Sequence, residues 1–137
     1  VQTCALPIYR AALQAVMDAR GRLITWVAAR VEAAGAISRA ARAGRIDGQV
    51  AGTRARDWFL GPAASIVMLP GSGAELVDTA VRIAGHGHLR ALDAMHVATA
   101  LTEGRRLAGT DDLVFVTLDT RQAAAAEAEG LSVVVPG

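Results

Sequence analysis

The chain has 137 residues, of which 53% are hydrophobic and 20% charged, and its formal net charge is +1. This length suits one globular domain, the composition excludes a disordered chain, and the near-neutral charge excludes a generic binder of polyanions. No apolar run approaches the roughly 18 to 20 residues of a membrane span, and the single cysteine, Cys4, cannot form an internal disulfide. We therefore expect a cytoplasmic protein without a membrane segment.

Predicted strands and helices alternate along most of the chain. In chain order, we expect a helix-like stretch over 9–22, a strand over 21–26, a helix over 28–44, a helix over 47–60 with Asp47 as its N-cap, a strand over 65–70, a helix from 72 to about 84, a helix over 88–104, a strand over 113–119, a helix over 120–130 and a strand over 131–135. Ser72 and Glu75 have the spacing of a capping box. This order predicts an α/β domain with a mainly parallel sheet flanked by helices, in which ligands bind beyond the carboxyl ends of the strands.

Charge is distributed unevenly along the sequence. Residues 1–60 carry nine arginines and four acids, whereas residues 61–137 carry five arginines and nine acids. Every basic side chain apart from histidine is arginine, which favours bidentate contacts to phosphate or carboxylate. A GC-rich genome is the simpler explanation for the absence of lysine.

Three acids stand out against their surroundings. Asp93 falls between Leu89 and Val97 on an apolar helix face, where an ionised carboxylate needs a partner or a cation. A salt bridge to Arg90 or a contact with His96 is the structural explanation for it.

Glu32 and Asp119 are the other two acids. Glu32 has only small residues one helical turn away, which leaves room for a ligand, although a pair with Arg30 or Arg39 explains it as well. Asp119 ends the strand over 113–119 and is also a good N-cap, and both roles coexist only if different oxygens serve them.

Together, three such acids at one sheet edge make a hard, oxygen-rich site suited to Mg²⁺ or Mn²⁺, and ions of this kind assist phosphodiester cleavage in many nucleases. Spacing in the sequence does not establish that Glu32, Asp93 and Asp119 converge. A zinc site made by His86, His88, Asp93 and His96 is a weaker alternative, because no cysteine pair supports it.

The segments "HLRALDAMHVATAL" and "LVFVTLDTRQAAAAEAEGLSVV" resemble the acidic helix, acid-ended strand, closing helix and final strand of PIN domains, in particular VapC-type toxins. "LITWVAARVEAAGAISRAARAGRI" is similar to the segment that carries the family's helical glutamate. The resemblance implies a PIN-like three-layer fold and a metal-dependent endoribonuclease of a type II toxin–antitoxin pair, with Glu32, Asp93 and Asp119 as catalytic, metal-binding acids.

The same resemblance implies partners: RNA, a VapB-like antitoxin whose tail enters the acidic site, and a second copy in a homodimer. Arginines near the cleft would then meet RNA phosphates, namely Arg39, Arg42 and Arg45. Thr117, two residues before Asp119, would assist by hydrogen bonding. The alternative in another class is a catalytically silent PIN-like module that only binds an antitoxin or RNA, and a more distant one is a different α/β protein in which Asp119 is a nucleophile or a cap.

The family begins with a strand that ends in aspartate, and nothing before Gly21 matches it. Residues 1–8 resemble the translation of a sequencing-library adapter, so we expect them to be non-native and residues 9–137 to form one PIN-like domain that lacks its first strand. On this interpretation Cys4 has no function, and the chain itself has impaired activity.

Overall fold

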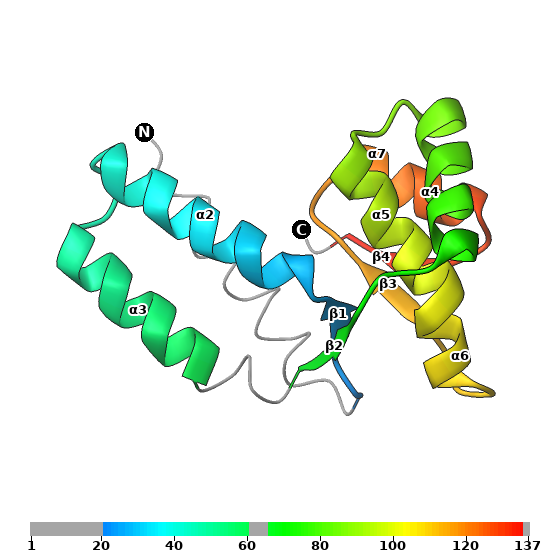
Figure 1. Cartoon of the computed structure of the whole chain (residues 1–137), viewed down its shortest axis with the longest axis horizontal. Helices are drawn as coiled ribbons and strands as arrows, with labels where there is room; N and C mark the ends of the chain where they lie inside the picture. The colour runs from blue at the N-terminus through cyan, green and yellow to red at the C-terminus, as the bar shows by residue number, and fades with distance from the viewer. Residues whose placement is uncertain (1–20, 61–65, 136–137) are drawn as a thin grey trace. The chain divides into compact units, whose positions relative to one another are not determined.

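A computed structural model describes residues 21–60 and 66–135, which fall into two compact units. Unit 2 is Arg22–Pro70, and the described part of unit 1 is residue 21 with residues 71–135. Helices and short parallel strands make up both units (Figure 1). The α/β class predicted from the sequence is confirmed. The adapter-like residues 1–8 and residues 9–20 of the predicted helix-like stretch lie outside the described residues, and residues 21 and 22 at the end of that stretch are not helical.

Unit 2 pairs two strands in parallel and carries two helices. Its elements are β1 (Ile24–Trp26), α2 (Ala28–Arg42), α3 (Gly48–Leu60) and β2 (Val67–Leu69). Ile24 lies opposite Val67 in the β1–β2 register, and the Trp26 indole N–H donates to the Pro70 carbonyl over 3.3 Å. The Asp47 carboxylate accepts the backbone N–H groups of Gln49 and Val50 at 2.9 and 3.1 Å, so the predicted N-cap of the second helix is confirmed.

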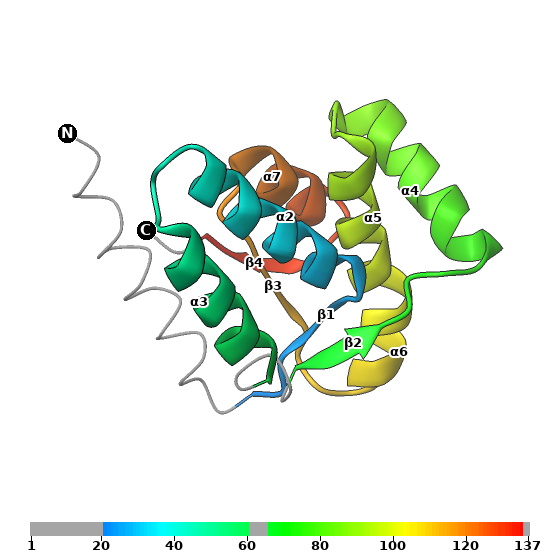
Figure 2. The same cartoon turned by 60° about the vertical axis from the view of Figure 1, so that its left-hand side comes forward.

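Unit 1 holds the other strand pair and most of the helices. Its elements are α4 (Ala74–Gly87), α5 (Ala91–Thr99), the π-helical segment η2 (Ala100–Gly104), α6 (Arg105–Ala108), β3 (Val114–Val116), α7 (Thr120–Ala128) and β4 (Ser132–Val134). The strands β3 and β4 are parallel, and both views show α7 beside α5 (Figures 1 and 2). The core lies between α4, α5 and α7 and is built from small and branched residues, including Leu76, Ile83, Val97, Ala98 and Ala126. Short side chains let α5 and α7 approach closely.

The helix predicted over 88–104 is wrong at both ends. His88 has a left-handed backbone (φ 51°) that ends α4, and α5 begins only at Ala91. At the other end Gly104 is buried inside a continuous helical run that passes through η2 and α6 to Ala108. The run stops at Gly109, where φ is 60° and glycine is favoured. The glycine that ends the helix is therefore the second one, five residues beyond the predicted one.

The predicted capping box of Ser72 and Glu75 is also wrong. Gly73, with φ 103°, precedes α4, and no side chain caps this helix. Instead the Glu103 carboxylate accepts the backbone N–H groups of Gly71 and Ser72 at 2.9 and 3.1 Å. Glu75 pairs with Arg106. An acid 31 residues away thus satisfies the donors that sequence reasoning assigned to local partners.

Strand β3 is shorter and more exposed than predicted. It covers three residues of the predicted 113–119, and its Val114 and Val116 side chains are 47% and 42% exposed, whereas Phe115 packs against the core. The expectation of burial on both faces is wrong for the described residues. Among the helices of those residues, none is both long and apolar enough to cross a bilayer.

Candidate metal and nuclease site

Asp119 stands at the carboxyl end of β3, where the backbone leaves the strand and enters α7. Its Oδ1 accepts the backbone N–H groups of Arg121 and Gln122 at 2.8 and 3.2 Å, which makes it the N-cap of α7. Among the described residues, its other oxygen, Oδ2, has no hydrogen-bond partner. The cap predicted for Asp119 is confirmed and uses Oδ1 alone, so within the described residues Oδ2 is left for a ligand.

The surroundings of Asp119 keep its carboxyl ionised. The backbone N–H of Gln122 and then that of Arg121 lower the pKa of Asp119, and the positive charges of Arg121 and Arg90 act in the same direction. Desolvation opposes these effects without outweighing them. Asp119 is thus an anion at neutral pH, as a ligand for a divalent cation must be.

A short chain of hydrogen bonds connects Asp119 to the helix that carries Asp93. The Asp119 backbone N–H donates to Thr117 Oγ1 at 3.1 Å, and the Thr117 hydroxyl donates to Gln122 Oε1 at 2.6 Å. The Gln122 amide then donates from Nε2 to the backbone carbonyl of Asp93 at 3.3 Å. Two acids separated by 26 positions in the sequence are in this way held at neighbouring elements of unit 1.

Asp93 lies in the first turn of α5 and is half-buried. The described residues give its carboxylate no hydrogen bond and no ion pair, so neither Arg90 nor His96 acts as the partner proposed for it. His96 makes a contact of its own and is not available as a free ligand. An acidic side chain that is partly withdrawn from water and unpaired favours a cation.

The zinc alternative fails within the described part of the chain, because no three histidine, cysteine or acidic side chains gather there closely enough to hold a metal. Within unit 1, a chain of hydrogen bonds links the backbones of two acids, Asp93 and Asp119. The third predicted acid, Glu32, lies on α2 in unit 2, where it is half-buried and engaged in a contact. The structure thus connects two of the three predicted acids within one unit.

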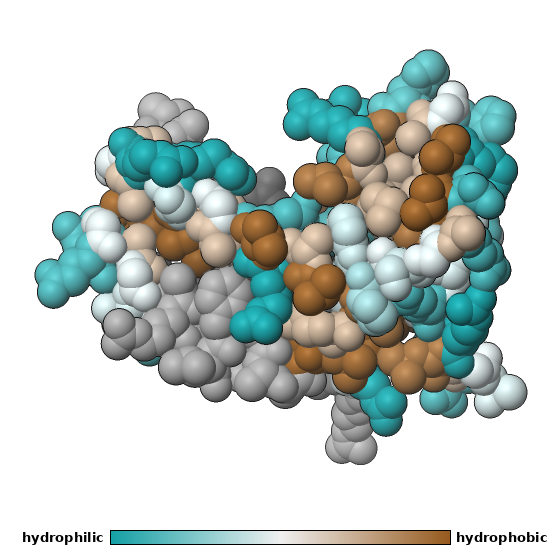
Figure 3. All heavy atoms as spheres, in the orientation of Figure 1, coloured by the Kyte–Doolittle hydropathy of each residue, from teal (hydrophilic) through white to brown (hydrophobic). Residues whose placement is uncertain are grey.

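The arginines predicted to meet RNA occupy the end of α2 and the turn after it. Arg39, Arg42 and Arg45 are exposed, and Figure 3 shows hydrophilic side chains gathered over this end of the helix. Arg39 Nη1 lies 3.0 Å from the position that a Cβ on Gly35 would take, so its guanidinium fills the space left by the missing side chain. Arg42 donates to Ser38 Oγ at 3.2 Å.

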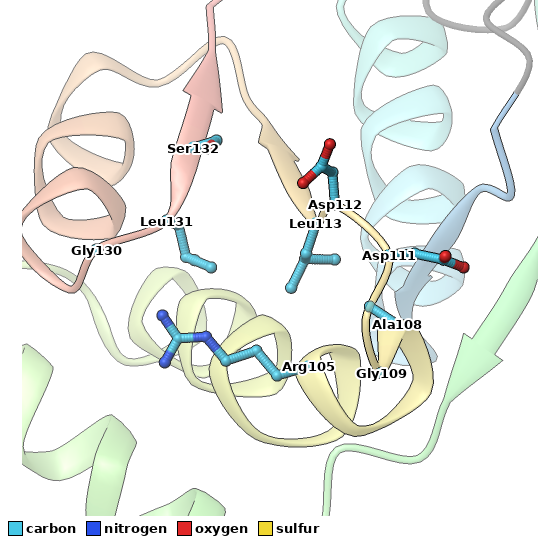
Figure 4. Close-up of a pocket in the computed structure, with 9 residues that line it drawn as sticks. All are labelled: Arg105, Ala108, Gly109, Asp111, Asp112, Leu113, Gly130, Leu131 and Ser132. Carbon is cyan, nitrogen blue, oxygen red and sulfur yellow. The ribbon is translucent and has the colours of Figure 1, made fainter.

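A cavity of about 320 Å³ opens at the end of the β3–β4 pair where the two strands begin, opposite to the end that carries Asp119. Figure 4 shows the residues that line it, among them Arg105, Leu113 and Leu131, which come from α6 and from the segments that lead into the two strands. None of the predicted site residues lines this cavity. Asp119 lies at the opposite end of the strand pair, the carboxyl edge, where α/β folds place their sites.

Comparison of the sequence with known protein families shows the family to which the chain belongs. A family model described as the PIN domain matches residues 6–128. The chain belongs to the PIN-domain family. No curated protein and no solved structure matches it. PIN domains are generally nucleases and typically use divalent metals, so the family assigns a nuclease-type function to the chain.

The residue of this PIN domain that sequence reasoning missed is Gln122. It is the third residue of α7, and a glutamine there after an Asp N-cap is the pattern of a capping box, in which the amide reaches back to the N–H of the cap. Here Thr117 accepts that N–H, and Gln122 accepts from Thr117 instead. The sequence signal for this arrangement is "TLDTRQ". It is a capping-box pattern in which the Thr117 hydroxyl lies between the Asp119 N–H and the Gln122 side chain.

Proposed function

We propose that this PIN domain is a metal-dependent endoribonuclease, the VapC-type toxin of a type II toxin–antitoxin pair, with Glu32, Asp93 and Asp119 as its metal-binding acids. The observation that carries the proposal is that, among the described residues, Asp119 Oδ2 and the Asp93 carboxylate have no hydrogen-bond or ion-pair partner. Asp119 uses its other oxygen as a cap, and Gln122 bonds the backbone carbonyl of Asp93.

The residues present fit the ion. Ionised carboxylates are the hard oxygen ligands that Mg²⁺ and Mn²⁺ prefer, and the lowered pKa of Asp119 keeps this ligand deprotonated at neutral pH. Asp93 and Asp119 would hold the ion, and Glu32 is the third acid that the family resemblance assigns to it. When bound, such an ion supplies positive charge against the phosphodiester and activates water.

The chain's own residues have separate tasks in this proposal. Arg39, Arg42 and Arg45 bind phosphates of single-stranded or structured RNA along the end of α2. Thr117 orients Asp119 through the backbone N–H that it accepts. Charge on the acids repels RNA until a cation neutralises it, which makes substrate binding depend on the metal.

Regulation and assembly follow the same family pattern. We infer that a VapB-like antitoxin inserts its tail at the acidic edge and that two copies of the chain form a homodimer. Size-exclusion chromatography with light scattering tests the second inference: we expect twice the chain mass, and a single-chain mass at micromolar concentration contradicts it.

Cleavage of RNA in Mg²⁺ or Mn²⁺ tests the enzyme assignment. We expect weak cleavage by this chain, with fragments that disappear in excess chelator and on the Asp93→Asn substitution, which keeps the size of the side chain and removes its charge. Asp78→Asn, on an exposed position of α4, is the matched control and should cleave like the wild type. Equal cleavage in chelator, or by Asp93→Asn, contradicts the metal-nuclease proposal.

A catalytically silent PIN-like module is the second candidate, and it is favoured by the absence, among the described residues, of any three acidic, histidine or cysteine side chains close enough to hold a metal. This module would retain RNA or antitoxin binding without turnover. RNA retained in a filter-binding assay, with no cleavage at any concentration of Mg²⁺ or Mn²⁺, would select this candidate.

A further inference from the structure

Gln122 is a polar side chain in an apolar place. It is only 8% exposed and lies on the face of α7 that also buries Ala123, Ala125 and Ala126. A buried amide is costly unless its donors and acceptor are paired. Both ends of this amide are paired, and its backbone N–H donates to Asp119.

The partners of the Gln122 amide fix its orientation. A backbone carbonyl only accepts, so the NH₂ group must face Asp93, and Oε1 must then face Thr117. The Thr117 hydroxyl consequently donates to Oε1 and accepts the Asp119 N–H. The result is one directional chain of hydrogen bonds from the Asp119 backbone to the Asp93 backbone.

This chain spans the two elements that carry the candidate ligands. An apolar side chain of the same size would fill the space equally well, but it would set neither the distance nor the register between the start of α5 and the start of α7. Side chains behind the ligands of a metal site commonly hold them in place in this manner.

We propose that Gln122 is a positioning residue that fixes the Asp93 and Asp119 carboxylates relative to each other for metal binding. The inference rests on the proposed function. It adds Gln122, a residue outside the set of acids. It also gives Thr117 a defined task, because the Thr117 hydroxyl connects the Asp119 N–H to Gln122.

Binding of Mn²⁺ to the whole chain, followed by electron paramagnetic resonance, tests the proposal together with amide hydrogen exchange. Gln122→Met keeps the volume and removes both hydrogen bonds, and we expect affinity to fall about tenfold or more. The Asp119 amide, which Gln122 reaches only through Thr117, should exchange about tenfold faster because its acceptor is no longer held. Thr117→Val should have the same two effects, whereas Thr117→Ser, which keeps the hydroxyl, should restore both.

Thr102→Val is the matched control. It removes a hydroxyl that donates to the Ala98 carbonyl at 2.9 Å in a buried part of η2, so it perturbs the fold without touching the chain of hydrogen bonds. Its Mn²⁺ affinity should stay within about twofold of the wild type, since it leaves the ligands and their supports in place. Wild-type exchange of the Asp119 amide in Gln122→Met overturns the positioning role. Absence of Mn²⁺ binding by the wild type refutes the proposed function instead. In that case the exchange rate of the Asp119 amide in Gln122→Met alone decides whether Gln122 holds the starts of α5 and α7 in place.

Discussion

At the scale of single residues, we propose that Asp119 uses one carboxylate oxygen for the fold and the other for the metal site. Oδ1 caps α7 and Oδ2 remains for a cation. Asp47 provides the comparison, because it caps α3 in the same manner and has no place in the site. Substitutions at Asp47 and Asp119 can therefore be compared to distinguish the loss of a helix cap from the loss of a proposed metal ligand.

We predict that Asp119→Asn keeps the stability of the protein and that Asp119→Ala does not. Asparagine caps helices about as well as aspartate, because its carbonyl oxygen accepts the same N–H groups. Asp47→Ala should lower the free energy of unfolding by about 1 kcal/mol, and Asp119→Ala should have an effect of the same kind. Urea unfolding followed by circular dichroism measures all three, and equal losses for the Asn and Ala variants would contradict the assignment of Oδ1 as the cap.

Residue identities in the candidate site were predictable where a local rule applied. The N-caps at Asp47 and Asp119 follow from residue type and position, and both are present. Gln122 escaped because its partners include a residue 29 positions away, which no local rule identifies. For Asp93 the local pattern was misleading: it offered Arg90 and His96 as partners, and neither bonds the Asp93 carboxylate among the described residues.

At the scale of elements, Glu103 joins η2 to the segment before α4. Its carboxylate accepts two backbone N–H groups, from Gly71 and Ser72, and so fixes the segment that leads into α4, a helix without a side-chain cap. A π-helical segment changes the direction in which the side chains after it point, and such segments frequently occur at functional sites.

We predict that Glu103→Ala loosens the start of α4. Loss of two hydrogen bonds to a charged acceptor should lower the free energy of unfolding by about 1 to 3 kcal/mol. The amides of Gly71 and Ser72 should lose protection in hydrogen exchange, while those in the middle of α5 should keep it. Glu75→Ala, at an acid whose side chain is 69% exposed, is the control and should change neither quantity; full protection of Gly71 in Glu103→Ala would contradict the role of the carboxylate.

A bidentate pair joins α4 to the end of α7. Arg82 donates from both terminal nitrogens to Glu129 at 2.6 and 2.8 Å. This hydrogen-bonded guanidinium lowers the pKa of Glu129, mainly through the hydrogen bond and then through its charge. The folded-state pKa is thus below the unfolded value of about 4.3. The stabilisation is present above that value and is lost as the pH falls through the lower folded-state pKa.

We predict that Arg82→Met destabilises the protein at neutral pH and that the difference from the wild type vanishes in acid. The effect should be small, because half of the Arg82 side chain is exposed, and 1 M salt should reduce it further. Arg106→Met, in the more exposed pair with Glu75, should change little at any pH. Thermal unfolding between pH 2 and pH 7 measures both variants, and a difference that grows in acid would contradict this account.

Prediction of elements from the sequence succeeded for their type and order and failed at their ends. Each described strand and helix except α6 was expected near its observed place, because hydrophobic periodicity reflects which face is buried. The ends depend on distant contacts and on backbone conformation at single positions. Glu103 replaced the expected capping box, and Gly109 rather than Gly104 ended the long helical run.

At the scale of the whole molecule, residues 1–60 carry most of the arginines and residues 61–137 most of the acids. Unit 2 carries Arg39, Arg42 and Arg45 on an exposed end of α2, whereas unit 1 carries Asp93 and Asp119. In the proposed enzyme, the first set binds the RNA backbone and the second holds the ion.

We predict that replacing all three arginines with glutamine weakens RNA binding and reduces its dependence on salt. Each lost phosphate contact to a single strand lowers the slope of log affinity against log salt by about 0.7, so the triple variant should lose about 2. Arg106→Gln, at an exposed site on α6, is the matched control. Fluorescence anisotropy with a labelled RNA measures the slope, and an unchanged slope would place the RNA elsewhere.

The most direct test of the central claim is a titration of the chain with Mn²⁺, comparing the wild type with Asp119→Asn and Asp47→Ala. The claim is that Asp119 serves as a cap through Oδ1 and as a metal ligand through Oδ2. We predict that Asp119→Asn, which keeps the cap, loses affinity by at least about tenfold, and that Asp47→Ala, which loses a cap, binds Mn²⁺ like the wild type. Wild-type affinity in Asp119→Asn would contradict the claim.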